Sequence, residues 1–242
     1  MGNLLRAELH KLIKQKSLYI CMGIVILLIA VPILIFASED MQNVGTYLFL
    51  SSFSGSGIDM LLPVLISLLL CGDFTSGTVR LMVGRGYSRA AIYLSKFILT
   101  FAVVLFAGAI SWCTALICIS AFLDCDVLIN GRILLMLTLQ LAAMFAVGVF
   151  SFLVAMLTRK SSITIAAGLI TPSAGTILIT LSDVFLKKVN FKITDYWFFT
   201  FLAELSEQSA SNSVLLRCGV VTLIYIAVFF VVGLLAFNKS DI

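Results

Sequence analysis

The residues best suited to bind a partner gather in one polar stretch, residues 73–96, which reads DFTSGTVRLMVGRGYSRAAIYLSK. Three glycines divide it into short pieces and permit tight turns; they are Gly77, Gly84 and Gly86. Ser88 is a suitable N-cap for a helix that begins at Arg89 and continues into the next apolar run. Cationic and apolar side chains presented together suit a groove on a partner protein, whereas a plain basic loop would serve only as a topology signal.

The chain carries no complete motif for catalysis. HExxH, GxSxG and the GxxxxGK[ST] phosphate loop are absent. Residues 55–59, GSGID, miss the GxGD pattern of intramembrane proteases by one residue. The single histidine, His10, has no neighbouring metal ligand. Five of the six cysteines lie in or beside apolar runs, where cysteine packs as a small hydrophobe. We therefore expect neither catalysis nor a metal or cofactor on this chain.

Four further residues are candidates for a substrate path: Asp59, Gln140, Pro172 and Trp197. Asp59 lies near the start of an apolar run, and a carboxylate there is either functional or an anchor at the outer interface, where we expect it. Gln140 lies deep in another run, which favours hydrogen bonding between helices.

Two local patterns surround Pro172 and Trp197. Residues 171–176, TPSAGT, predict a kinked or broken helix, whose freed backbone groups need protein or water around them. Residues 196–201, YWFFTF, are typical of an aromatic belt that lies in lipid headgroups, and a contact site for an amphipathic substrate is the alternative.

The elements that position these residues are membrane spans. Of 242 residues, 61% are hydrophobic and 12% are charged, with mean hydropathy +1.15, and the apolar residues form runs long enough to cross a bilayer. The sequence predicts an all-α, polytopic membrane protein with one transmembrane domain over residues 1–242. Before the spans, residues 1–16 predict a basic amphipathic helix on the membrane surface, with Leu5, Leu9, Leu12 and Ile13 on its apolar side. The six predicted spans are residues 18–37, 55–72, 97–123, 133–157, 163–185 and 218–237.

Charge counting predicts the orientation. With the N-terminus inside, eleven of the sixteen basic residues lie on the inner side, so the positive-inside rule places both termini in the cytoplasm. Residues 186–217 then form an extracytoplasmic segment, whose three lysines oppose the rule. The net charge of +4 does not indicate nucleic acid, because the basic residues flank apolar runs.

The polar stretch and the order of the predicted helices together resemble those of ABC type-2 permeases, which are common in Gram-positive bacteria. Some members of this family protect against antimicrobial peptides. The resemblance rests on Gly77-Thr78, Arg80, Ser88-Arg89 and Ser95-Lys96, and on a surface helix followed by six spans. It implies a coupling helix in residues 73–96 that docks on a separate ABC ATPase subunit, which binds ATP and Mg²⁺. It also implies a second permease copy or a related permease. The implied docking residues are Asp73, Phe74, Gly77, Thr78, Arg80, Leu81, Gly84, Arg85, Ser88 and Arg89.

We therefore expect a permease subunit of an ATP-driven exporter in the bacterial cell membrane, moving a hydrophobic or amphipathic substrate such as a peptide or lipid. Two alternatives need no ATPase. An intramembrane enzyme would need one of the absent motifs, and a secondary transporter would show inverted repeats and charges at the membrane midplane.

Overall fold

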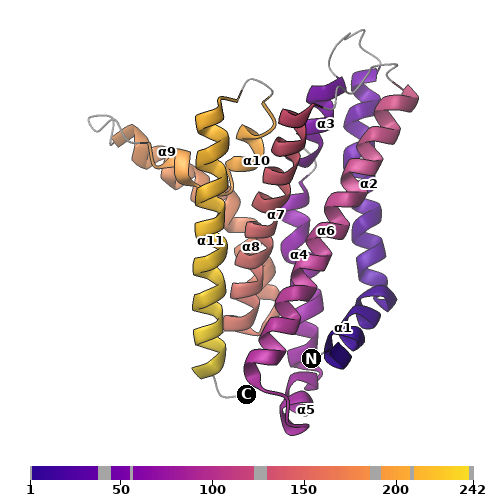
Figure 1. The fold of residues 1–242 in the computed structure, drawn as a ribbon, viewed down its shortest axis with the longest axis vertical. Helices are drawn as coiled ribbons and strands as arrows, with labels where there is room; N and C mark the ends of the chain where they lie inside the picture. The colour runs from indigo at the N-terminus through magenta and orange to yellow at the C-terminus, as the bar shows by residue number, and fades with distance from the viewer. Residues whose placement is uncertain are drawn as a thin grey trace.

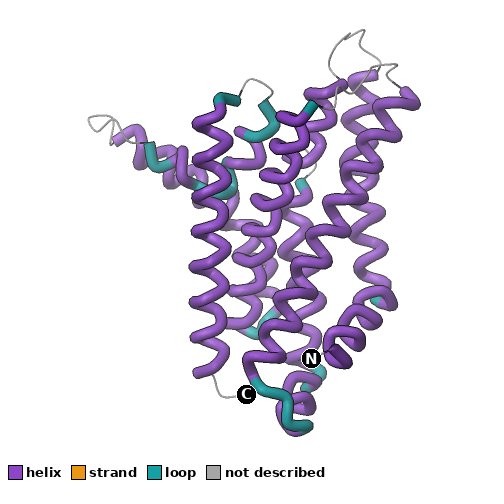
Figure 2. Tube along the Cα trace, viewed as in Figure 1, coloured by secondary structure: helices purple, strands orange, loops and turns teal. Residues whose placement is uncertain are grey.

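The computed structural model describes residues 2–37, 45–54, 57–122, 130–185, 192–207 and 210–239. Throughout these ranges the chain is a bundle of helices joined by short connections (Figures 1 and 2). Six of the described helical segments are long and apolar enough to span a membrane, which confirms the predicted all-α, six-span class. The helices are α1 Gly2–Lys14, α2 Lys16–Ala37, α3 Gly45–Ser54, α4 Ile58–Thr75, α5 Thr78–Gly84, α6 Arg89–Phe122, α7 Gly131–Thr158, α8 Ser161–Ile170, a π-helix Thr171–Gly175, α9 Thr176–Phe185, a 3₁₀ turn Thr194–Tyr196, α10 Phe201–Glu204 and α11 Asn212–Lys239.

Helix α7 is the centre of the bundle and packs against α4, α6, α8 and α11. Small side chains along it are fully buried, among them Ala143, Ala146, Ser151 and Ala155, and they let the neighbouring helices approach closely. Helix α2 packs on the other side of α6 and on α4.

Both chain termini lie at the same end of the bundle, together with α1 and α5 (Figure 1). We call this the α5 end, and the opposite end, where α3 lies, the α3 end. Termini at one end agree with an even number of spans.

The second span is broken in two. At about 1.5 Å per residue, the 18 residues of α4 cover about 27 Å and the 34 residues of α6 about 51 Å. Since both helices flank α5, α4 begins roughly 24 Å short of the far end of α6, and α3, which packs on α6 and α10, lies above it (Figure 1). Asp59 lies in the first turn of α4, and our expectation that it sits at the outer interface stays a prediction.

The fifth span is broken as well, as the sequence predicts. The chain forms the π-helix over Thr171–Gly175, with Pro172 removing one backbone donor. Beyond the break, α9 turns away from the bundle and projects sideways (Figure 1), and it has no buried residue. Its exposed apolar side chains are Ile177, Leu178, Leu181, Val184 and Phe185.

The aromatic run after α9 folds inward. Phe198, Phe199 and Phe201 are buried, and Phe198 lies 6.0 Å from Phe150 of α7 and 5.7 Å from Phe229 of α11, measured between ring centroids. The expectation that this run lies in lipid headgroups is therefore wrong for these three rings. Phe198 thereby fills the core between α7 and α11, well inside the bundle.

Candidate functional site

Helix α5 is a single short helix set between two turns. The chain enters through Gly77, with φ of 70°, and leaves through Gly86, with φ of 84°, a conformation that L side chains rarely adopt. Backbone bonds close both turns, since Leu81 N donates to Gly77 O at 3.1 Å and Gly86 N to Val83 O at 3.0 Å. The predicted turns at two of the three glycines are confirmed, whereas Gly84 ends the helix itself.

The two sides of α5 differ in exposure. Val79 is buried against the bundle, whereas Leu81 is 64% exposed and Arg80 and Arg85 are also exposed. Val79, with Met82 and Val83 half-buried against the core, attaches the helix, and Leu81 with two cations remains on the outside. This is the surface expected of a docking element.

The helix after α5 begins as predicted. Ser88 Oγ accepts a hydrogen bond from Ala91 N at 3.2 Å, which confirms Ser88 as the N-cap of α6. Arg89 Nη1 donates to Asn238 O at 3.2 Å, which links the start of α6 to the end of α11.

A cluster of charged side chains ties α1 to both helices that flank α5. Glu8 of α1, Asp73 of α4 and Lys96 of α6 are each no more than 2% exposed. Lys96 Nζ donates to Glu8 Oε1 at 2.5 Å and to Asp73 Oδ2, and Lys11 Nζ donates to Asp73 Oδ1. Removing one partner of such a buried pair leaves an uncompensated charge, so the cluster holds α1, α4 and α6 in one arrangement. We call these four residues the charge cluster.

Lys11 is the most accessible member of the charge cluster, with its side chain 47% exposed. Burial lowers the pKa of its ammonium group, Lys96 lowers it further by repulsion, and Glu8 opposes the shift. Lys11 is therefore a peripheral member, whereas Lys96 is the cation on which both buried carboxylates depend.

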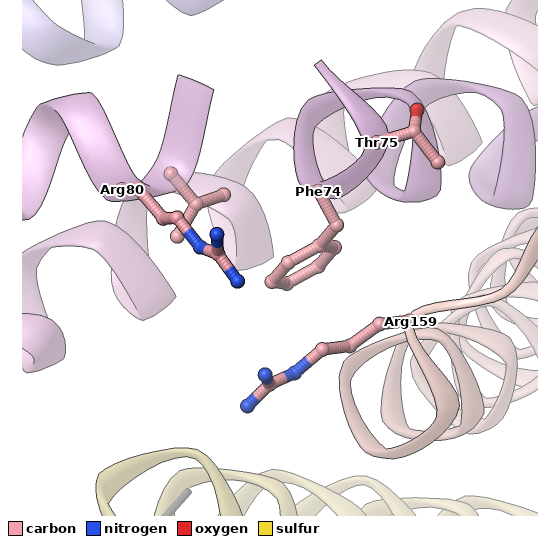
Figure 3. A pocket seen from close by; sticks show the side chains of 5 residues that line it. Phe74, Thr75, Arg80 and Arg159 are labelled. Atoms are coloured by element: carbon pink, nitrogen blue, oxygen red, sulfur yellow. The ribbon is translucent and has the colours of Figure 1, made fainter. Parts of the chain in front are cut away.

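A cavity of about 160 Å³ lies beside α5. Phe74, Thr75, Val79, Arg80 and Arg159 line it. Figure 3 shows the guanidinium groups of Arg80 and Arg159 pointing into the same space, with the Phe74 ring between them. Arg159 Cζ lies 5.8 Å from the centroid of that ring, within range of a cation–π contact. We call it the arginine pocket.

The backbone at Arg159 is unusual. With φ of 55°, it is the only non-glycine residue at positive φ in the described ranges. It ends α7 in the left-handed conformation that helices commonly use at this position, usually with glycine. An L side chain there costs roughly 1–2 kcal/mol.

The residues of the predicted docking segment divide between surface and interior. Arg80, Leu81, Gly84, Arg85 and Ser88 are exposed; Phe74, Gly77, Thr78 and Arg89 are half-buried. Asp73 is buried in the charge cluster, so a direct contact with a partner would first require that cluster to open. Docking by these residues stays a prediction.

The four candidate substrate-path residues fall at separate places. Pro172 and Trp197 both lie at the break in the fifth span. Trp197 Nε1 donates to Thr176 Oγ1 at 3.2 Å. The Trp197 ring covers Gly175 so closely that a Cβ on Gly175 would lie 2.8 Å from the ring. Asp59 marks the break in the second span.

Gln140 has the interhelical bonding role that its position predicts. Its Nε2 donates to Leu50 O of α3 at 3.0 Å and to Leu205 O, just after α10, at 3.3 Å. It therefore fastens α7 to the other elements of the α3 end.

Lys11 and Arg159 enter the sequence prediction only as basic residues that set the topology, Lys96 enters also as part of the family resemblance, and Glu8 does not enter it. The spacing of residues in α1 could have indicated that Glu8 is buried. Leu4, Glu8 and Leu12 recur every four residues and are all buried, so the acid stands in the middle of the buried stripe of α1. The buried side of α1 differs from the predicted apolar side, because Ile13, which was placed on that side, is 60% exposed.

A family model described as ABC-2 family transporter protein matches residues 4–175, a range that includes the charge cluster, α5 and Arg159. No curated protein matches the chain. Because the match covers well over half of a chain with six candidate spans, the protein belongs to the ABC-2 family of transporters, as a multi-pass membrane permease without a catalytic domain.

Proposed function

We propose that the chain is the permease subunit of an ATP-driven exporter, which uses a separate ATPase subunit to move a hydrophobic or amphipathic substrate. ABC-2 membership implies an ATPase partner in general. The observation that carries the proposal is the construction of α5, whose exposed side combines Leu81 with two arginines while the helices on either side are fixed by buried charges. ATP and Mg²⁺ bind to the partner, and this chain supplies the docking element.

The packing supports a route for force. A push on α5 acts on α4 and α6, because short turns join α5 to both helices. Helix α4 packs on α7 and α8, and α6 packs on α2. The contact between α4 and α8 is close enough that a Cβ on Gly168 would lie 2.2 Å from Pro63 Cβ. Movement of α4, which belongs to the broken second span, is therefore passed directly to α8 of the broken fifth span.

We place the α5 end, with both termini, in the cytoplasm of a bacterial cell, and the segment 186–217 outside. The distribution of basic residues supports this orientation. A second observation supports it at α1, where a groove of about 500 Å³ has Lys11, Lys14 and Gln15 on one side and Leu68 and Gly72 on the other. Such a groove suits a surface helix lying among the anionic headgroups of the inner leaflet.

A second permease copy, or a related permease, completes the membrane part of the pump in this proposal. Apolar residues of α8 and α9 remain exposed in the single chain, Ile163, Ile170 and Leu178 among them, and they supply surface for such a contact or for lipid. The substrate path follows the breaks marked by Asp59 and Pro172, with Gln140 and Trp197 beside it. Export of an antimicrobial peptide is one narrower form of this hypothesis.

The test is capture of the ATPase by the tagged chain, purified from its own membranes. We expect an ABC ATPase to co-purify, and Leu81→Ser to weaken its capture roughly tenfold, since a buried leucine contributes about 1.5–3 kcal/mol. Ile13→Ser is the matched control, because Ile13 is 60% exposed at the same end but lies on α1. A native chain that captures no ATPase would refute the proposed function.

A further inference from the structure

A groove of about 500 Å³ lies between the end of α1 and α4, and we call it the α1 groove. Six residues of α1, α4 and the connections that follow them line it; they are Lys11, Lys14, Gln15, Leu68, Gly72 and Ser76. Its volume lies within the roughly 300–1,000 Å³ that is typical of sites for small-molecule ligands.

The lining of the α1 groove changes from polar to apolar along α4. Ser76 directly follows α4, Gly72 lies about one turn further into the span, and Leu68 lies about two turns further. At about 1.5 Å per residue these three positions cover about 12 Å of a candidate membrane span. Leu68 and Gly72 are both exposed. A soluble anion would need only the polar end of such a groove, whereas a phospholipid needs a polar head site that continues into an apolar strip.

The polar end of the α1 groove carries one positive charge in excess. The charge cluster contains two carboxylates and two ammonium groups, so it is neutral as a unit. Lys14 adds a further ammonium group, which is exposed and forms no ion pair with any residue that the structure describes. Lys11 pairs with Asp73 but is 47% exposed, which leaves it able to contact an anion as well. A phosphodiester carries a single negative charge and therefore matches the excess.

Gln15 presents an amide at the same end of the groove. Its Oε1 is buried and accepts no hydrogen bond from the described part of the chain. A buried acceptor without a donor costs free energy. A head group that carries hydroxyl donors, such as glycerol, can satisfy it, whereas choline has no donor to offer.

We propose that the α1 groove binds one anionic phospholipid, with its phosphodiester beside Lys11 and Lys14 and an acyl chain along Leu68. The bound lipid bridges α1 and α4, so it supports from the membrane side the contact that the charge cluster makes in the interior. This inference goes beyond the proposed function. It requires a chain that lies in a membrane and does not depend on an ATPase partner.

The direct test is a lipid titration of the purified whole chain, with any subunit that co-purifies, followed by native mass spectrometry. We expect one phosphatidylglycerol molecule to be retained in preference to phosphatidylcholine with the same acyl chains. Lys14→Gln should raise the Kd for phosphatidylglycerol about tenfold, the loss of one charge-assisted contact. Lys16→Gln is the matched control, because Lys16 is an exposed cation two residues further on and lies outside the groove. Equal affinity for the two lipids, or the same Kd in both variants, would overturn the inference.

The second test fills the groove without removing a charge. A Cβ on Gly72 would meet no atom within 4 Å, and leucine is a better helix former than glycine, so Gly72→Leu should be at least as stable to heat as the native chain. Its side chain would occupy the apolar strip, and selective retention of phosphatidylglycerol should be lost. Gly23→Leu is the matched control, since Gly23 is an exposed glycine of α2 with the same free space outside the groove.

Selective retention by Gly72→Leu would overturn the inference. Displacement of the lipid by inorganic phosphate, but not by chloride at the same ionic strength, would assign the groove to a soluble anion and would also overturn it. Both outcomes leave the proposed function intact, because neither measures capture of an ATPase.

Discussion

The two ends of the bundle are held together by different forces. At the α5 end, buried charges from α1, α4 and α6 share one ammonium group. At the α3 end, one buried neutral amide, that of Gln140, joins α7 to α3 and to Leu205, just after α10. Paired buried charges tolerate few geometries, whereas neutral and apolar side chains can repack at lower cost. We infer that the α5 end moves as one stiff unit and that the α3 end adapts to it.

The largest expected effect comes from removing the shared ammonium group. Lys96→Met leaves Glu8 and Asp73 buried without their common partner, and we expect a loss of about 3–5 kcal/mol in the free energy of unfolding. Thermal unfolding in nanodiscs measures it. Hydrogen exchange should rise in α1 and around α5 while α10 keeps its protection.

The matched control replaces all three charges. Lys96→Met combined with Glu8→Gln and Asp73→Asn removes the unpaired carboxylates, so a large part of the lost stability should return. If the single and triple variants are equally unstable, packing rather than charge holds the α5 end.

At the α3 end, Gln140→Leu should cost about 1–3 kcal/mol, because the buried carbonyls of Leu50 and Leu205 lose a donor. Hydrogen exchange should become faster in α3 and α10 and stay unchanged in α1, which is the opposite of the pattern expected for Lys96→Met. Equal exchange at both ends would mean that the two ends do not unfold separately.

A smaller effect is expected from Trp197→Phe, which keeps an aromatic ring over Gly175 but loses the bond from Nε1 to Thr176 Oγ1. We expect a loss of about 1 kcal/mol, the usual net value of one hydrogen bond, with faster exchange over residues 192–200. Thr176→Val removes the same bond from the other side and also the bond that Thr176 Oγ1 donates to Pro172 O at 2.5 Å, so it should cost more than Trp197→Phe. If the double variant is no worse than Thr176→Val alone, the bond between the two side chains accounts for the effect of Trp197→Phe.

The smallest effect is expected from Lys11→Gln, within about 1 kcal/mol, because the side chain is about half exposed. The pKa of Lys11 is lower in the folded chain than in the unfolded one. Its contribution to stability therefore rises as the pH increases through that lowered pKa, and this rise should be absent from the variant. A large loss in Lys11→Gln at neutral pH would show that Lys11, rather than Lys96, is the central cation.

The features that the sequence predicts correctly are local ones. Six spans follow from runs of apolar residues, the N-cap from Ser88 and its following helix, and the broken fifth span from Pro172 and its neighbours. Each is decided by residues close together in the chain, from one helical turn for the N-cap to about 20 residues for a span. The docking role of α5 comes from a resemblance and stays a prediction.

The features that the sequence does not reveal depend on distant partners. Glu8 and Lys96 lie 88 residues apart, so no spacing rule connects them. Helix α3 was missed because four serine and threonine residues dilute its hydropathy; they are Thr46, Ser51, Ser52 and Ser54. The buried aromatic run was misjudged since aromatic rings suit a headgroup layer and a protein core equally well.

The ammonium group of Lys96 also affects the order in which the helices can dock while the chain is being synthesised. The ribosome delivers Glu8 first, then Asp73, and Lys96 only with the third span. Until Lys96 arrives, Glu8 lacks the cation to which it is hydrogen-bonded, and Asp73 has only the half-exposed Lys11. Helix α1 therefore lacks its buried ion pair while the first two spans are being inserted. Its docking becomes a late step of assembly, so a nascent chain that stops after two spans keeps its N-terminal helix detached.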